Sequence, residues 1–192
     1  MRDANKGSGR LVAIQPPDYP VDIHLVYATA DNFVCLPVYA SDAQCVLHSD
    51  AADCLGRAAR AALRAGYVLR VLDAYRPPAA QEIFWQLCPD PRYLADPAVG
   101  SNHTRGIAVD VTLLDEAGQA LDMGTGFDDM REQSHHDRPD LPKAVQRNRS
   151  LLLGIMLQAG FESLPTEWWH YQLPDARRYP LIDDPAVQVV RI

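Results

Sequence analysis

The sequence has 192 residues and a formal net charge of −7 at pH 7. This length favours one domain, and the 47% hydrophobic content is sufficient for one sizeable core. The acidic balance argues against nucleic acid or an anionic membrane as the main partner, because both usually require a basic protein surface. We therefore expect a soluble, acidic, globular domain over residues 1–192.

The first ten residues are polar and lack the apolar core of a secretory signal, and no later run is long enough to cross a bilayer. A cytoplasmic protein is therefore expected, with a flexible N-terminal arm over residues 1–15. The cysteines have neither CxxC spacing nor the density of a disulfide scaffold, so we expect reduced thiols and no thiolate zinc site. They are Cys35, Cys45, Cys54 and Cys88.

The first half of the chain predicts a strand, a helix and a second strand. Ile23–Tyr27 is typical of a short strand that is followed by a loop. After a cap at Ser49 or Asp50, apolar residues at three- and four-residue spacing predict a helix that Gly66 ends. The alternating run Tyr67–Asp73 is rich in β-forming residues, so we expect a strand directly after that helix.

The second half predicts two more helices and two more strands. Pro77 and Pro78 suit the start of one helix, and Gly160 suits the end of another. Between them, Gly124–Pro142 is polar and predicts a long loop, and such loops are often functional. The predicted elements are a helix to Leu87, a strand over Ile107–Leu114 with a turn at Asp115–Gly118, a helix over Lys143–Ala159 and a strand over Trp169–Leu173. This order predicts an α+β fold, in which about three helices flank a small, mainly antiparallel sheet.

Two histidines and an aspartate have the composition of a zinc site. His103 and Asp110 lie on either side of Gly106, and His170 follows much later in an apolar setting. Each of these side chains alone more commonly satisfies a hydrogen bond, but together they supply the three protein ligands of a catalytic zinc ion. Gly106 can turn the chain so that His103 and Asp110 face one ion. We therefore expect one zinc ion per chain, at the sheet.

Two further residues suit the chemistry of hydrolysis. Glu167 lies three residues before a ligand, where it can take a proton from a zinc-bound water and return it to a leaving amine. Arg76 lies at a junction between a strand and a helix, where its guanidinium can hydrogen-bond an oxyanion. The alternatives are that Glu167 is a surface carboxylate or a residue at a helix start, and that Arg76 is a solvated turn residue.

Three motifs have the order and spacing of a known family. They are Asp73-Ala74-Tyr75-Arg76-Pro77, Ser101-x-His103-x-x-Gly106-x-Ala108-x-Asp110 and Glu167-Trp168-Trp169-His170. With them, the chain resembles the VanX-type D-alanyl-D-alanine dipeptidases, which are zinc peptidases, over roughly residues 20 to 185. The resemblance implies that His103, Asp110 and His170 are the zinc ligands, that Glu167 is the catalytic base and that Arg76 stabilises the transition state.

The resemblance also implies a small substrate pocket. Asp128 would meet the free amino group of a dipeptide, and Ser101 and Asp73 would line the same pocket. A carboxylate that pairs with an ammonium in a closed pocket excludes longer peptides without an amine at that place. Three alternatives stay open: that Asp73 only orients Arg76, that Ser101 only caps a turn, and that Asp129 takes the place of Asp128.

The implied activity is the hydrolysis of D-Ala-D-Ala to two D-alanines by a zinc-dependent dipeptidase in the cytoplasm. One alternative is a D,D-carboxypeptidase or endopeptidase acting on peptidoglycan stem peptides, and both the expected absence of a signal peptide and the presence of Asp128 argue against it. The other is a zinc-binding module without catalysis, and the presence of both Glu167 and Arg76 argues against that. The segment Val34-Cys35-Leu36 departs from the threonine-glycine-lysine run common in the family, which puts substrate preference in question more than chemistry.

Overall fold

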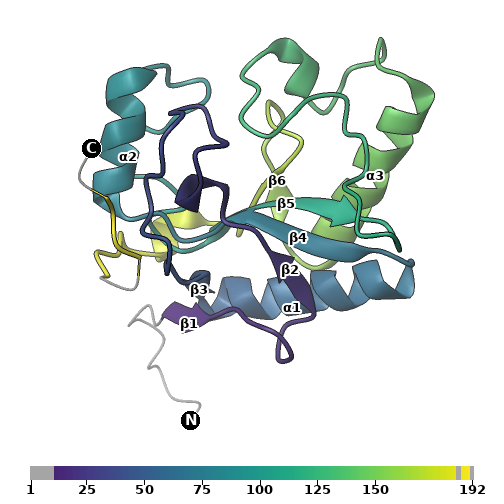
Figure 1. Cartoon of the computed structure of the whole chain (residues 1–192), viewed down its shortest axis with the longest axis horizontal. Helices are drawn as coiled ribbons and strands as arrows, with labels where there is room; N and C mark the ends of the chain where they lie inside the picture. Colours follow the sequence, from purple (N-terminus) through teal and green to yellow (C-terminus); the bar gives the residue numbers. More distant parts are fainter. Residues whose placement is uncertain (1–10, 185–186, 191–192) are drawn as a thin grey trace.

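The computed structural model describes residues 11–184 and 187–190, which form one α+β domain with three α-helices (Figure 1). Its central sheet has five strands in the order β2-β4-β5-β7-β6. Among these described strands, β2 and β4 run parallel, and the other neighbouring pairs are antiparallel. The expected fold class is therefore confirmed. The strands are β2 (Val21–Ile23), β4 (Val68–Asp73), β5 (Ala108–Leu114), β6 (Glu162–Ser163) and β7 (His170–Gln172).

β5 lies at the centre of this sheet and is fully buried. β4 and β7 pair with its two edges. Its sequence is apolar except for Asp110 and Thr112, as expected for a strand that is covered on both faces. The pairing register places Asp110 between Asp73 of β4 and His170 of β7. Three ionisable side chains from distant parts of the chain therefore lie side by side across the sheet.

α1 (Ser49–Arg64) runs along one face of the sheet, below it in Figure 1. Most of its apolar residues are buried in the main core, including Leu55 and Ala62, whereas Leu63 and the charged side chains are exposed. The cap differs from the expectation. His48 Nδ1 accepts a hydrogen bond of 3.1 Å from Asp50 N, so the cap is His48 rather than Ser49 or Asp50.

The other two helices lie on opposite sides of the view in Figure 1. α3 (Lys143–Gln158) packs against α1, and α2 (Pro78–Leu87) contributes to a second apolar cluster. Gly66 and Gly160 follow α1 and α3 with φ of 85° and 102°, the left-handed conformation that commonly ends a helix. The helix bounds therefore agree with the sequence pattern. Three short 3-10 turns are η1 (Val26–Ala28), η2 (Glu132–Ser134) and η3 (Ala176–Arg178).

A separate small sheet lies near the start of the described chain. β1 (Leu11–Ala13) pairs antiparallel with β3 (Val46–His48). The flexible arm expected over residues 1–15 is therefore wrong for Leu11–Ala13, which forms a paired strand. Residues 1–10 lie outside the described residues. Three residues are too few to carry a periodic pattern, so only the distant partner strand reveals this element.

The strand expected over Ile23–Tyr27 is wrong in its position. β2 ends at Ile23, and η1 follows it. Thr29 Oγ1 donates a hydrogen bond of 2.8 Å to Val26 O, which closes this turn. Tyr27 is thereby buried against Phe84, with ring centroids 4.5 Å apart. Burial of this tyrosine outweighs the weak local preference of the segment for a strand.

The polar segment 124–142 is a long loop, as expected, and η2 is its one helical element among the described residues. Arg149 of α3 donates hydrogen bonds to three backbone carbonyls in and beside this loop. The loop is therefore ordered by a buried side chain and not by its own periodicity.

The four cysteines are free thiols, as expected. No helix in the described ranges combines the length and the apolar composition that a membrane span requires.

Candidate active site

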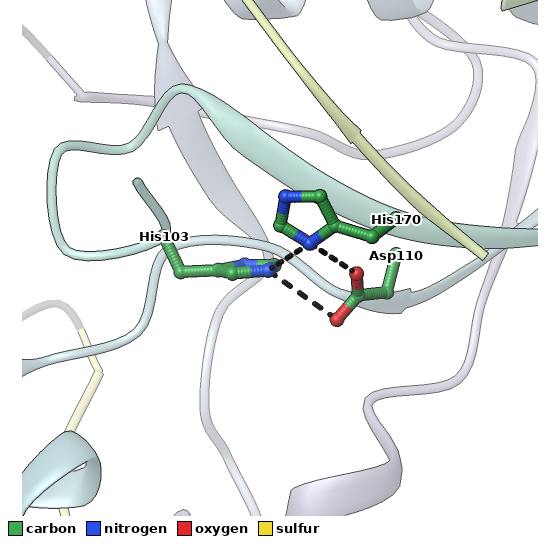
Figure 2. A group of neighbouring side chains, drawn as sticks. All are labelled: His103, Asp110 and His170. Atoms are coloured by element: carbon green, nitrogen blue, oxygen red, sulfur yellow. Dashed lines mark hydrogen bonds and ion pairs between the residues drawn. The ribbon is translucent and has the colours of Figure 1, made fainter. Parts of the chain in front are cut away.

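His103, Asp110 and His170 converge on one point at the sheet (Figure 2). His103 Nε2 lies 3.2 Å from His170 Nδ1 and 3.4 Å from Asp110 Oδ2, and His170 Nδ1 lies 3.1 Å from Asp110 Oδ1. Ligand atoms that bind a tetrahedral zinc ion at about 2.0–2.1 Å lie about 3.3 Å from one another. All three side chains are buried. Their spacing therefore suits a metal ion of this size.

The sheet and one turn bring these three side chains together. Asp110 and His170 face each other in the register of β5 and β7. His103 comes from the turn before β5, in which Gly106 has a φ of 69°. A Cβ atom on Gly106 would lie 3.0 Å from His48 N, so this position requires glycine for both its conformation and the close approach of β3.

The hydrogen bonds of His103 show that it presents a lone pair to the cluster. Its Nδ1 lies 2.7 Å from Ala74 O, which can only accept, so Nδ1 carries the hydrogen in the neutral ring. Nε2 is then a lone-pair donor that faces Asp110 and His170. Burial would raise the pKa of Asp110, but the neighbouring imidazole of His103, with that of His170, outweighs it and lowers this pKa. The donor set therefore fits a cation.

Glu167 lies beside this cluster without belonging to it. Its Oε2 is 3.8 Å from His170 Nδ1, and the residue is only 7% exposed. This burial excludes the alternative of a surface carboxylate. It also raises the pKa of Glu167 to about 7, which suits proton transfer in both directions near neutral pH.

Arg76 is buried, which excludes the alternative of a solvated turn residue. Its Nε and Nη2 donate to Asp73 Oδ2 at 3.0 and 2.8 Å, and Nη2 lies 3.8 Å from Asp110 Oδ2. The guanidinium also packs against two neighbouring aromatic rings, 5.3 Å from the Tyr27 centroid and 5.0 Å from that of Phe84. Arg76 is thus held in one orientation next to the three converging side chains.

Asp73 lies behind Arg76 and is fully buried. It is not among the residues that line the cavity described below, so the expectation that it lines the pocket is corrected in favour of the alternative that it orients Arg76. Ser101 lines the cavity and also accepts a hydrogen bond of 3.1 Å from His103 N. Ser101 therefore both lines the cavity and caps the turn, the two roles that the sequence left open.

A cavity of about 280 Å³ opens over these groups. Pockets for small ligands usually measure about 300–1,000 Å³, so this one suits a small substrate. His103, Asp110, His170, Glu167 and Arg76 all contact it. The cavity therefore joins the metal-binding side chains, a carboxylate of raised pKa and a guanidinium in one space.

Asp128 lines the same cavity from the long loop. Tyr27 donates its hydroxyl hydrogen toward both carboxylate oxygens, each 3.0 Å away. Burial and the nearby Asp110 raise the pKa of Asp128 well above its usual range. Asp129 instead pairs with the exposed Arg131. The ambiguity of one residue is therefore resolved geometrically, because Asp128 and not Asp129 contacts the cavity.

Three residues that hold this site were missed from the sequence. Tyr39 donates a hydrogen bond of 2.9 Å to Asp73, and Tyr27 orients Asp128. Gln81 accepts a bond of 3.0 Å from Arg76 Nη1 and donates one of 2.8 Å to the Ala95 carbonyl. Only Gln81 carried a signal, because it is a polar residue within the apolar stripe of a predicted helix.

The departure at Val34-Cys35-Leu36 does not reach the cavity. None of its residues is among those that line the cavity, and Cys35 is exposed in a turn with a φ of 60°. The side chain of Asn32 closes this turn by accepting a hydrogen bond from Val34 N and donating one to Leu36 O. The altered segment therefore affects a surface turn and not the wall of the site.

The chain is similar to proteins of one described family. A family model described as D-ala-D-ala dipeptidase matches residues 12–191. The D-alanyl-D-alanine dipeptidase of Escherichia coli (strain K12) is 49% identical over 173 residues, which cover 90% of this chain and 88% of that protein. Those of Streptomyces coelicolor and Enterococcus faecalis are 38% and 34% identical, each over 78% of this chain and 84% of the relative.

A solved structure of the LD-carboxypeptidase LdcB matches with a TM-score of 0.50 at 16% identity and covers 90% of this chain and 73% of that chain. At this identity the match indicates a shared fold. The family match spans nearly the whole chain, and the curated relatives match over most of their own length. The chain thus belongs to the D-alanyl-D-alanine dipeptidase family of peptidases.

Proposed function

We propose that this protein is a zinc-dependent dipeptidase of the cytoplasm that hydrolyses D-Ala-D-Ala to two D-alanines. The observation that carries the proposal is the convergence of His103, Asp110 and His170 in a small cavity beside Glu167 and Arg76. Membership of the family supports the substrate, since the curated relatives bear the name of this activity.

The three converging side chains would hold one zinc ion. When bound, zinc supplies a Lewis acid that polarises the peptide carbonyl and makes a water molecule more acidic. Two neutral imidazoles and one carboxylate leave the site with a net positive charge, which favours this chemistry. His103 is prepared for such a role, because its hydrogen bond to Ala74 O directs the Nε2 lone pair into the site.

Glu167 would move the proton. It accepts a proton from the attacking water as the water oxygen bonds to the carbonyl carbon. It then donates that proton to the amine nitrogen as the carbon–nitrogen bond breaks. A pKa of about 7, caused by burial, matches both transfers. No covalent intermediate is required.

Arg76 would stabilise the oxyanion that forms on the carbonyl. Three of its N–H groups already bond to Asp73 and Gln81, so the guanidinium is oriented before substrate binds. The remaining N–H groups are available to the substrate, because a guanidinium carries five. Preoriented donors of this kind lower the barrier without reorganisation during the reaction.

Asp128 would select the length of the substrate. Its carboxylate faces the cavity from the loop and complements the free ammonium of a dipeptide. A longer peptide would place an amide and further residues there, in a cavity with little room for them. Glu167 and Arg76 act at the scissile bond, whereas Asp128 acts at the end of the substrate.

The proposal is tested by incubating purified, zinc-loaded protein with D-Ala-D-Ala and with a longer peptide that ends in D-Ala-D-Ala. We expect release of D-alanine from the dipeptide alone, and loss of this activity after zinc is removed with a chelator. Release from the longer peptide would support a carboxypeptidase instead. No release from either substrate would contradict any peptidase activity and leave a zinc-binding module.

A further inference from the structure

A chain of two amides lies behind the converging side chains. Asn102 Nδ2 donates a hydrogen bond of 2.7 Å to Gln172 Oε1. The same oxygen lies 3.1 Å from His170 Nε2, the ring nitrogen that points away from His103 and Asp110. Asn102 precedes His103 in its turn, and Gln172 ends β7. These amides therefore connect the two histidine-bearing segments on the outer side of the site.

The ring of His170 needs such a contact to present a lone pair. A neutral imidazole carries its hydrogen on one nitrogen, and a metal binds the other. Nδ1 faces the carboxylate of Asp110 at 3.1 Å, which attracts the hydrogen to Nδ1 and would block metal binding there. An acceptor at Nε2 opposes this attraction. Gln172 Oε1 is the acceptor that lies at this nitrogen.

A glutamine amide can present either its oxygen or its NH₂ group, so Gln172 alone does not decide the matter. The NH₂ group would favour a hydrogen on Nδ1, and the oxygen favours a hydrogen on Nε2. In this structure the Asn102 NH₂ group donates to the Gln172 oxygen, and this pairing directs the same oxygen to His170 Nε2. Both side chains also reach the cavity wall, at the edge of the site.

We propose that Asn102 and Gln172 are positioning residues that keep the hydrogen of His170 on Nε2, so that Nδ1 is free to bind the metal. The inference rests on the metal site proposed above. Neither amide contacts the metal or the reacting atoms in this role. Loss of a group that orients a metal-binding histidine typically weakens metal affinity about 10–100-fold.

The first test uses zinc affinity, measured by competition with a chelator. Gln172→Leu removes the acceptor and should weaken zinc binding about 10–100-fold. Gln172→Glu keeps an acceptor at the same place and should restore affinity to within a few-fold of the parent. Equal affinity of the parent and Gln172→Leu would overturn the proposal. A parent that binds no zinc would instead overturn the proposed function.

The second test reverses the amide. Asn102→Asp replaces the NH₂ donor by an acceptor, which turns the Gln172 NH₂ group toward residue 102 and toward His170. We expect weaker zinc binding by about tenfold. The added negative charge alone would strengthen binding of a cation, so the two explanations predict opposite signs. Stronger or unchanged binding in this variant would contradict the role of Asn102.

The third test observes the hydrogen directly and needs neither zinc nor activity. Long-range proton–nitrogen NMR spectra of the metal-free protein, recorded at alkaline pH so that the ring is neutral, identify which ring nitrogen carries the hydrogen. We expect Nε2–H for His170 in the parent and in Gln172→Glu, and Nδ1–H in Asn102→Asp. Nδ1–H in the parent would overturn the proposal. Thermal unfolding of each metal-free variant separates this effect from a loss of fold.

Discussion

On the sheet wall of the cavity, adjacent strands bring Asp110 and His170 together in register, whereas on the loop wall Asp128 comes from the irregular segment 124–142. Arg76 follows β4 and Glu167 precedes β7, so both belong to the sheet wall. Asp128 has a φ of 59°, an uncommon conformation for an aspartate, and is oriented by the Tyr27 hydroxyl. The two walls thus differ in how their side chains are held.

From this difference we infer that the residues of the two walls have different roles. Groups that act on the scissile bond require precise mutual placement, which paired strands supply. A group that binds the end of the substrate tolerates a position on a loop, where recognition residues are common. We therefore expect changes on the sheet wall to reduce turnover and changes on the loop wall to alter substrate selection.

The largest effect is expected from Glu167→Gln. The amide has the shape of the carboxyl group but cannot accept the proton, so kcat should fall by about 10²–10⁴-fold. Zinc affinity should change only a few-fold, because Glu167 is not among the three converging side chains. Steady-state kinetics and metal analysis of the same sample check both statements. Turnover near that of the parent would remove Glu167 from the role of base.

Arg76→Lys should give the second largest effect. Lysine keeps the charge but lacks the planar fork that bonds to Asp73 and Gln81. Loss of an oriented oxyanion donor typically costs about 10²–10³-fold in kcat. KM should change much less than kcat, since the contact strengthens in the transition state. A change confined to KM would place Arg76 in substrate binding instead.

On the loop wall, Asp128→Asn should alter selection more than turnover. The parent should prefer D-Ala-D-Ala over its N-acetyl derivative, which has no ammonium. The variant should lose about 10–100-fold of this preference, the usual contribution of a hydrogen bond to a charged group. Asp129→Asn is the matched control and should leave the preference unchanged, because Asp129 pairs with Arg131 at the surface. An equal effect of both substitutions would contradict the assignment.

The smallest effect concerns the stability at low pH of the segment 124–142, which carries Asp128 of the loop wall. Burial lowers the pKa of His136 to about 4, and the nearby Arg149 adds to this shift. In the unfolded chain this imidazole has its ordinary pKa of about 6.5, which is higher than its pKa in the folded protein. The stability from neutral His136 is therefore complete above pH 6.5 and is lost as the pH falls toward 4.

For a side chain that is only partly buried, this loss should amount to about 1–2 kcal/mol. Urea unfolding at pH 7.5 and pH 5.0, compared between the parent and His136→Asn, isolates it. The variant should lose less stability than the parent on acidification. The same loss in both proteins would contradict the role of His136.

The pattern of the sequence determined the helices and the long strands. α1 and α3 have apolar residues at helical spacing and end at glycines, and β5 is an apolar run long enough to be recognised. The motifs around His103 and His170 also identified the side chains that meet at the site. Such signals depend only on residues near one another in the sequence, so they can be recognised without knowledge of the fold.

Short strands and distant contacts were decided only by the tertiary structure. β1 and β3 have three residues each and are recognisable only as a pair. Tyr27 and Asp128 are 101 positions apart, and no periodicity links a phenol to a carboxylate at that separation. Pairing and burial stabilise these contacts after the chain has folded, and local sequence does not encode them.

The orientation of each site residue was also decided by the fold. The sequence identified Asp73 and Arg76 as site residues. The strand register and the hydrogen bond from Tyr39 place Asp73 behind Arg76 and away from the cavity. Likewise, the motifs named His170, but Gln172 and Asn102 lie where they can select its protonated nitrogen. The sequence by itself determined which groups are present, and packing determined which atom of each group faces the cavity, because hydrogen-bond partners come from distant segments.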